Sequence, residues 1–401
     1  IPMSFVKRIL LCAAALWMLP APAAERADTA VSFVICDSGH DVYELEGHAA
    51  LHVTLPDGHD AAVHWGLFDF DAPGFVWRFA LGETDYLCGA IPATYALSGY
   101  DGRRVVEQQL NLSQTQAQQV RDLLVENARP ENATYRYKFV SDNCATRPRD
   151  IIECALGDSL TYHPAASAKL TYRDMMHNYN GNYAWSRFGI DLALGCDLDT
   201  AITYRQQMFA PVVLEKALAK ATVKRADGSV VPLVGATEVL VDGSEEGLVA
   251  PPTPWYATPL FVALVLLALA LALTVRDCRR RKVSRWFDTL VFAAYALWGC
   301  VIFFLVFVST HECTSPNYNA LWLHPAYLLL AVLPWVAKAR KVLTALHIIN
   351  FVWLTASAVL LATGVLSQEL LLSFYVLMAV PMVRSFNYLY IHRLCNHEVV
   401  K

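Results

Sequence analysis

The chain has 401 residues, of which 55% are hydrophobic, and a formal net charge of −4. So large an apolar share is unusual for a water-soluble protein of this length and indicates membrane segments. The weak net charge gives no indication of a nucleic-acid partner or of a strongly acidic one. The apolar residues are unevenly distributed: up to about residue 254 the chain has the pattern of a globular domain, and beyond it long apolar runs alternate with basic or polar loops.

Residues 1–24 have the three parts of a secretory signal peptide. Two basic residues precede an apolar run at 9–19, and small residues follow it. That run is shorter than the roughly 20 residues of a membrane-spanning helix, so we expect a cleaved signal, with a retained anchor as the alternative. The next domain is then exported to a compartment that permits disulfides. We expect at most one or two bridges, and one option is a bond between Cys36 and Cys88.

The exported domain, expected over residues 25–255, mixes strand and helix patterns. Alternating and β-branched residues predict strands at 31–36, 48–55, 61–66, 104–110 and 135–139. A cap at Ser113 and helical periodicity predict helices at 114–128, 149–156, 170–180, 202–209 and 211–221. Asp227-Gly228 indicates a hairpin turn. Together these elements predict an α+β domain.

Cys144 lies just before the predicted helix at 149–156 and directly after Asn143. Unpaired N–H groups and the positive end of a helix dipole stabilise a thiolate, and the same N–H groups can hold an oxyanion. Four basic residues flank the cysteine, and we expect them to lower its pKa further: Arg136, Lys138, Arg147 and Arg149. Taken alone, the cysteine is better interpreted as buried and inert. Nearby histidines reverse that preference.

A thiol nucleophile needs a base, and the first strands supply histidines. His48 and His52 share one strand face, and His64 lies on the next predicted strand. We expect His48 to be the base and His64 the third catalytic member, with a packing role as the alternative for each. His40, His52 and His59 are expected at the surface or in turns. The histidine cluster leaves a zinc hydrolase as a further alternative, but no zinc-ligand spacing supports it, so we expect no metal or other cofactor.

Five apolar runs follow, each near the length of a membrane-spanning helix, at about 258–275, 287–308, 321–337, 342–364 and 367–383. Six basic residues crowd the first loop and three lie in the third, whereas the second loop has no Lys or Arg. By the positive-inside rule the first and third loops are cytoplasmic, which places the N-terminal domain outside and the C-terminus inside. The signal peptide predicts the same orientation. The runs also lack the buried charges of a transport pathway, which argues against a non-catalytic transport or assembly factor.

The loop between the second and third runs places polar groups at the outer membrane surface. It is interpreted either as an ordinary interfacial loop or as part of a substrate groove. The candidate groove residues are His311, Asn317 and Asn319.

The order of the chemical groups also carries a resemblance. A strand histidine, a polar residue on the next strand and Asn-Cys at a helix start resemble the circularly permuted papain-like group that includes lecithin–retinol acyltransferase. Several stretches are similar to the Lnb-type periplasmic domain: Cys36–Gly39 with Glu44, Leu45–Ala50, Phe68–Asp71, Glu126–Asn132, Tyr135–Tyr137, Asp142–Arg147, Phe188–Asp191 and Met208–Pro211. The polytopic tail, with its polar outer loop, is similar to the membrane domain that accompanies it.

This resemblance implies a papain-like (NlpC/lecithin–retinol acyltransferase-like) exported domain and a helical membrane domain of about five spans over residues 256–401. It implies a bacterial inner-membrane enzyme with a periplasmic catalytic domain. The implied reaction moves an acyl chain from a phospholipid, through a Cys144 thioester, to the α-amino group of the lipid-modified N-terminal cysteine of bacterial lipoproteins. His48 is the implied base.

Binding residues are expected around the thiol. The basic flank can hold a lipid phosphate, and two tyrosines either line the pocket or pack. The candidates are Asn143, Arg136, Lys138, Arg147, Tyr135 and Tyr137. A membrane-anchored periplasmic thiol peptidase or amidase of the NlpC type is the alternative function; it shares the site but needs only one anchor.

Overall fold

The computed structural model describes residues 28–39, 44–93, 102–164, 169–243 and 251–398. The expected signal peptide therefore lies outside the described residues. The chain forms two compact units: an exported unit of Ile1–Tyr179 and Ala201–Ala250, and a membrane unit of Asn180–Thr200 and Pro251–Lys401. A separate boundary between residues 255 and 256 was expected. The membrane unit instead also takes a segment from the middle of the exported region.

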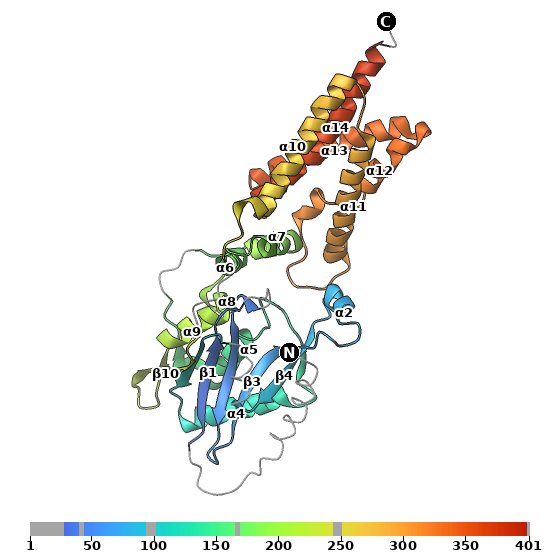
Figure 1. Ribbon diagram of the computed structural model, residues 1–401. Helices are drawn as coiled ribbons and strands as arrows, with labels where there is room; N and C mark the ends of the chain where they lie inside the picture. Colours follow the sequence, from blue (N-terminus) through green and yellow to red (C-terminus); the bar gives the residue numbers. More distant parts are fainter. Residues whose placement is uncertain (1–27, 40–43, 94–101, 165–168, 244–250, 399–401) are drawn as a thin grey trace. The chain divides into compact units, whose positions relative to one another are not determined.

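Seven antiparallel strands form the main sheet of the exported unit, in the order β10-β5-β1-β2-β3-β4-β6 (Figure 1). They are β1 (Ala30–Cys36), β2 (His48–Thr54), β3 (Asp60–Leu67), β4 (Asp85–Ile91), β5 (Val105–Leu110), β6 (Thr134–Arg136) and β10 (Val234–Val241). The four predicted strands β1, β2, β3 and β5 are confirmed to within one residue at each end. Neither β4 nor β10 was predicted, and β6 is shorter than expected.

Three helices cover one face of this sheet: α4 (Gln114–Ala128), α5 (Thr146–Leu156) and α9 (Pro211–Lys220). Alternate strand residues such as Phe33 and Leu51 point to that face and are fully buried with Val120 of α4. Ser113 accepts a hydrogen bond from Gln116 N–H and starts α4 with a capping box, as its sequence indicated. The expected α+β mixture is confirmed. The papain-like assignment stays a prediction.

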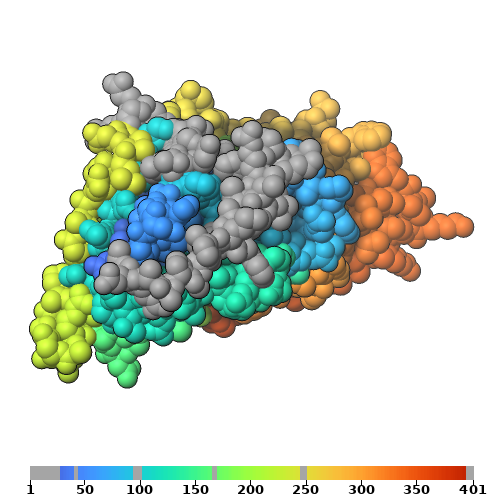
Figure 2. Space-filling model, turned by 90° about the horizontal axis from the view of Figure 1, so that it is seen from below, coloured from blue at the N-terminus to red at the C-terminus, as the bar shows by residue number. Residues whose placement is uncertain are grey.

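Smaller elements complete the exported unit. They are α6 (Tyr172–Tyr179), α8 (Tyr204–Gln207) and a second sheet of β7 (Leu160–Thr161), β8 (Thr222–Lys224) and β9 (Val230–Pro232). The predicted hairpin joins β8 to β9, where Gly228 adopts a positive φ of 86°. This region occupies the left of the face shown in Figure 2, in yellow-green.

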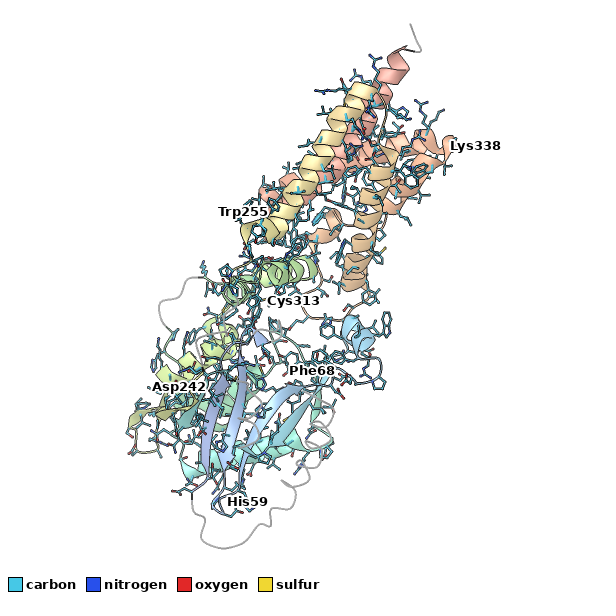
Figure 3. The ribbon with its side chains drawn as sticks, in the orientation of Figure 1. His59, Phe68, Asp242, Trp255, Cys313 and Lys338 are labelled. Atoms are coloured by element: carbon cyan, nitrogen blue, oxygen red, sulfur yellow. The ribbon has the colours of Figure 1, made fainter. Side chains whose placement is uncertain are left out.

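The two ends of the main sheet differ. At one end the β2–β3 turn carries His59, which is exposed and is labelled in Figure 3. At the other end β3 leads to Phe68 and then to the short helix α2 (Phe75–Leu81), which stands beyond the strand ends in Figure 1. His48, the first residue of β2, belongs to this second end.

The membrane unit contains four helices, among its described residues, that are long and apolar enough to cross a membrane. They belong to α10 (Pro259–Arg280), α11 (Arg285–Phe307), α13 (Arg340–Ala362) and α14 (Leu372–Glu398). The third of the five predicted spans is wrong as a continuous helix. It forms α12 (Tyr327–Val332) followed by two short 3₁₀ turns, Leu333–Trp335 and Ala337–Ala339. Prolines at 325 and 334 lack the N–H that a continuous helix needs.

This broken segment runs back along α11. Its start lies against the middle of that helix, where a Cβ on Gly299 would meet the backbone of His324. Its end lies near the start of α11, where the Trp335 indole donates to Thr289 Oγ1 at 2.9 Å. Figure 3 places Cys313 and Lys338 toward opposite ends of the membrane unit.

Buried charges occur in the membrane unit, so the expectation that its spans lack them is wrong. Arg384 of α14 is fully buried and forms ion pairs with Asp277 of α10 and Asp288 of α11. Its third nitrogen donates to Thr274 Oγ1 at 2.9 Å. This cluster could not be predicted from the sequence, because the two aspartates lie near helix ends, next to basic loops, where charged residues are ordinarily exposed. The three charges join three helices.

Candidate active site

The sulfur of Cys144 lies at the end of the sheet where β2 begins. Cys144 is buried, with 8% of its surface exposed, and precedes α5 by two residues, as predicted. The backbone N–H of Ala49 and the hydroxyl of Tyr137 donate hydrogen bonds to the sulfur. The β2–β3 register runs only as far as Ala50 opposite His64, and Ala49 is one residue beyond that pair. The thiol therefore contacts the strand directly after His48.

Asn143 builds the turn that carries the cysteine. Its side-chain oxygen accepts from the N–H groups of Ala145 and Thr146, both at 2.9 Å, and so caps the start of α5. Its amide nitrogen donates to the carbonyl oxygens of Phe139 and Phe209, at 2.7 and 2.9 Å. The structure thus gives this predicted substrate-binding residue a positioning task. The helix-start N–H groups expected to hold an oxyanion are already occupied by it.

His48 and His64 lie together on one sheet face. His48 Nε2 is 3.1 Å from His64 Nδ1, and the two rings are nearly parallel, at an interplanar angle of 9°. Burial lowers the pKa of both imidazoles, and His64 lowers that of His48 further. Both rings are therefore neutral near pH 7, and one donates its N–H to the other. The structure brings together the two histidines that the sequence singled out.

Glu46 is a site residue that the sequence reading missed. Burial is the main cause of the raised pKa of the Cys144 thiol and of the Tyr137 and Tyr179 hydroxyls, and the Glu46 carboxyl raises each pKa further. Burial raises the pKa of Glu46 itself to about 8. The carboxyl is therefore largely protonated at neutral pH. The signal that could have found it is its position two residues before His48, on the chain that enters β2.

The thiol pKa is shifted opposite to the sequence expectation. Burial raises the pKa of Cys144 to about 11, against the opposing hydrogen bonds of Ala49 N–H and the Tyr137 hydroxyl. The resting residue is thus a neutral thiol, and the predicted lowering is wrong. Desolvation outweighs the effect of the helix start on the thiol pKa because Cys144 is buried.

The basic flank is occupied by carboxylates. Arg136 pairs with Asp85, Arg147 with Asp142, and Arg149 with Asp150. The Arg147 guanidinium also lies 4.2 Å from the ring centre of Tyr135. None of the four basic residues is among the largest influences on the Cys144 pKa. As phosphate ligands, Arg136, Lys138 and Arg147 remain a prediction, as does pocket lining by Tyr135.

The other histidines of the early strands lie away from the thiol. His52 Nδ1 is 2.6 Å from Glu107, and this hydrogen bond raises the histidine pKa. His59 is exposed in the β2–β3 turn, and His40 lies outside the described residues. Within the part of the chain that the structure describes, no group of three or more His, Cys, Asp or Glu is placed to hold a metal ion.

The exported cysteines are unbridged. Cys36, Cys88, Cys144, Cys154 and Cys196 are all free thiols in the structure. The disulfide considered between Cys36 and Cys88 is therefore not formed.

The polar outer loop belongs to the membrane unit and is hydrogen-bonded to residues 191–193 of the same unit. The Asn317 amide donates to the carbonyl oxygens of Leu192 and Ala193, and the Asn319 amide donates to that of Asp191 at 2.9 Å. These carbonyls end helix α7 (Ala184–Ala193), an element that the sequence reading missed.

Both asparagines are buried, so the structure supports a structural role for them. The proposed contribution of His311 to a substrate groove stays a prediction.

Comparison with known families agrees with this division of the chain. Residues 23–178 match the Lnb N-terminal periplasmic domain, and residues 252–394 match the Lnb transmembrane domain. The chain belongs to the Lnb family. No curated protein and no solved structure matches it.

Membership identifies this Lnb protein as a membrane enzyme of lipoprotein biogenesis with a periplasmic domain. The match to the periplasmic domain ends close to the last residue of α6. The match to the transmembrane domain begins close to the boundary at Pro251.

Proposed function

We propose that this Lnb protein is a thiol-dependent lipoprotein N-acyltransferase of the bacterial inner membrane. Its acyl donor is a membrane phospholipid, and its acceptor is the α-amino group of a lipoprotein's lipid-modified N-terminal cysteine. The observation that carries the proposal is a buried Cys144 thiol that accepts from the N–H of Ala49, the residue after His48, whose imidazole lies 3.1 Å from His64. No cofactor is required by this chemistry.

In the first step Cys144 attacks the ester carbonyl of the phospholipid. The C–S bond forms as the thiol proton moves to His48, and the C–O bond breaks as that proton passes to the leaving oxygen, releasing a lysophospholipid. If His48 Nε2–H donates to His64 Nδ1, then His48 Nδ1 carries the lone pair that accepts the thiol proton. His64 in this arrangement fixes the tautomer and orientation of the base.

The neutral resting state of the Cys144 thiol and the His48 imidazole is consistent with this step. A raised thiol pKa and a lowered imidazole pKa keep the proton on sulfur until a carbonyl is present. In the proposed transition state the Ala49 N–H and the Tyr137 hydroxyl, which donate to the sulfur in the resting enzyme, stabilise the negative charge that develops on the carbonyl oxygen.

In the second step the lipoprotein amine attacks the thioester. The C–N bond forms and the C–S bond breaks, and His48 carries the amine proton to the departing sulfur, which restores the thiol. The membrane unit keeps both lipid-bearing substrates in the plane of one bilayer, which raises their effective concentration at the site.

The experiment is mass spectrometry of the N-terminal peptide of a reporter lipoprotein. It is produced in cells whose only N-acylating enzyme is the wild-type protein, Cys144→Ala or His48→Ala. We expect the N-linked acyl chain with wild type and its loss in both variants. Cys154→Ala and His59→Ala, which change an exposed cysteine and an exposed histidine, are the matched controls and should retain acylation.

Equal acylation in all strains contradicts the proposal. If acylation is absent even with wild type while Cys144-dependent cleavage of cell-wall peptides is found, the thiol peptidase function is supported instead.

A further inference from the structure

Helix α2 exposes an unusual set of large apolar side chains on the exported unit. It spans only Phe75–Leu81, and none of its residues is buried. The exposed fractions of its large side chains and of a neighbour in the preceding loop are 77% for Val76, 62% for Trp77, 47% for Phe79 and 51% for Phe70. Contiguous exposed apolar side chains of this size indicate an interaction site.

A row of aromatic rings connects this helix to the thiol. The centres of successive rings are 6.0 Å apart for Phe79–Phe75, 5.7 Å for Phe75–Phe68, 4.8 Å for Phe68–Tyr86 and 5.2 Å for Tyr86–Tyr137. The hydroxyl of Tyr137 at the end of the row hydrogen-bonds the Cys144 sulfur. Phe68, in the middle, lies at the sheet end opposite to His59 (Figure 3). The aromatic row thus leads from the exposed ring of Phe79, through the buried ring of Tyr86, to the tyrosine that donates to the nucleophile.

A lipid bilayer is the occupant that the chain itself provides. The exported unit is covalently joined to the membrane unit at three points, after residues 179, 200 and 250. The membrane unit holds four helices suited to crossing a bilayer. Trp and Phe side chains prefer the membrane–water interface, and Arg78 in the last turn of α2 can reach lipid phosphates while its stem stays in the apolar layer.

We propose that α2 inserts into the membrane surface facing the exported unit and that the aromatic row guides a phospholipid acyl ester from the bilayer to Cys144. Insertion of α2 stands on its own, and guidance to Cys144 rests on the proposed acyltransferase function. The acyl chain would lie along the rings while the ester carbonyl reaches the sulfur.

The first test uses the full-length protein reconstituted in phosphatidylethanolamine–phosphatidylglycerol vesicles that contain alkyne-tagged phospholipid. A photo-crosslinking benzoylphenylalanine replaces Trp77 or, as the matched control, Val230, a β9 residue that is 64% exposed. We expect a lipid adduct from position 77 and none from position 230. Absence of the adduct at position 77, or equal adducts at both positions, overturns the insertion of α2.

The second test measures acylation of Cys144 from vesicle phospholipid and from a short water-soluble ester. Trp77→Ser with Phe79→Ser should raise the apparent KM for vesicle phospholipid roughly tenfold, because two buried aromatic contacts with lipid are lost. Reaction with the soluble ester should be unchanged, and Val230→Ser should match wild type in both assays. An equal loss with both substrates overturns the guidance role.

The two proposals fail in different ways. If wild type forms the lipid adduct at position 77 but never forms an acyl thioester at Cys144, the acyltransferase function is wrong and membrane insertion of α2 stands. If the thioester forms normally in the absence of the adduct, α2 insertion is wrong and the acyltransferase function stands.

Discussion

Tyr137 joins the thiol to the sheet through a single hydroxyl, and its ring leaves no room for a side chain at Gly66, where φ is 83°. Tyr137→Phe keeps the ring and removes the donor to the sulfur. We expect acyl-thioester formation at Cys144 to slow roughly 100-fold, because one donor to the developing oxyanion is lost. Time-resolved peptide mass spectrometry measures the rate.

Tyr135→Phe is the control for this change, because the Tyr135 hydroxyl has no hydrogen-bond partner among the described residues. Its rate should match wild type. A wild-type rate in Tyr137→Phe as well would remove the hydroxyl from the mechanism.

Glu46 predicts a pH-dependent difference. Its pKa of about 8 means that the carboxyl is neutral below that pH and charged above it, and the charged form raises the pKa of the Cys144 thiol. Alkylation of Cys144 by iodoacetamide should therefore be faster in Glu46→Gln than in wild type above pH 8. Below about pH 7 the two rates should be equal, as peptide mapping can establish.

The same carboxyl makes a prediction about stability. Because the pKa of Glu46 is raised by folding, the folded state holds its proton more tightly than the unfolded state does. Stability is then lost as pH rises from the unfolded pKa of about 4.5 through 8. Glu46→Gln should melt at a higher temperature than wild type at pH 9 but not at pH 4. The reverse order would show that the carboxyl is ionised in the fold.

The sequence singled out Cys144, His48 and His64 as candidates, because a thiol and histidines in this order are recognisable residue types, and the structure brings the two histidines together. It could not identify the Ala49 N–H, since a backbone donor has no residue type. Nor could it give the direction of the Cys144 pKa shift, because charges near in sequence are visible while burial is not. Arg147 shows the point: it is three residues from the thiol and is paired with Asp142.

At the scale of elements, strong local patterns predicted the structure and tertiary contacts decided the rest. β1 and β2 have the alternation of strands, and α4 has helical periodicity and the Ser113 cap. β4 contains Gly89 within its strand, and α7 is a ten-residue helix whose stability comes from burial in the membrane unit. The prediction of the third span as one helix was wrong because it rested on apolar composition, which does not take account of the interruptions at Pro325 and Pro334.

The buried cluster around Arg384 makes a prediction about three helices at once. Arg384→Met leaves Asp277 and Asp288 buried without their counter-ion, and we expect a loss of about 3–5 kcal/mol in stability. The neutral combination Arg384→Met, Asp277→Asn and Asp288→Asn should recover most of that loss. The fraction of monodisperse protein extracted from membranes, by fluorescence-detected size-exclusion chromatography, is the measurement.

Arg280→Met is the matched control, since Arg280 is an exposed arginine at the end of α10. It should match wild type. A single Arg384→Met variant as stable as the neutral triple variant would show that the two carboxyls are already uncharged.

The whole molecule is divided differently from the linear order of its chain. Residues 180–200 return to the membrane unit, where Phe188 contacts Phe374 and Leu192 is buried. A chain ending at Ala250 should therefore aggregate, because this segment loses its apolar cover. Replacing residues 180–200 by a flexible Gly/Ser linker in the same truncated chain should restore solubility and alkylation of Cys144.

Size-exclusion chromatography and peptide-resolved alkylation measure both properties. Equal solubility of the two truncated chains would show that the segment is stable without the membrane helices.

The early position of α7 in the chain also sets an order of events during synthesis. Residues 184–193 leave the ribosome before the first membrane helix at Pro259, and Phe374, which covers Phe188, is made later still. β10 is synthesised before the first membrane helix, so the sheet can close before that helix is made. Each new molecule thus passes through an interval with a finished exported sheet and an uncovered α7. That interval is when the nascent protein is most open to proteolysis and most in need of a chaperone.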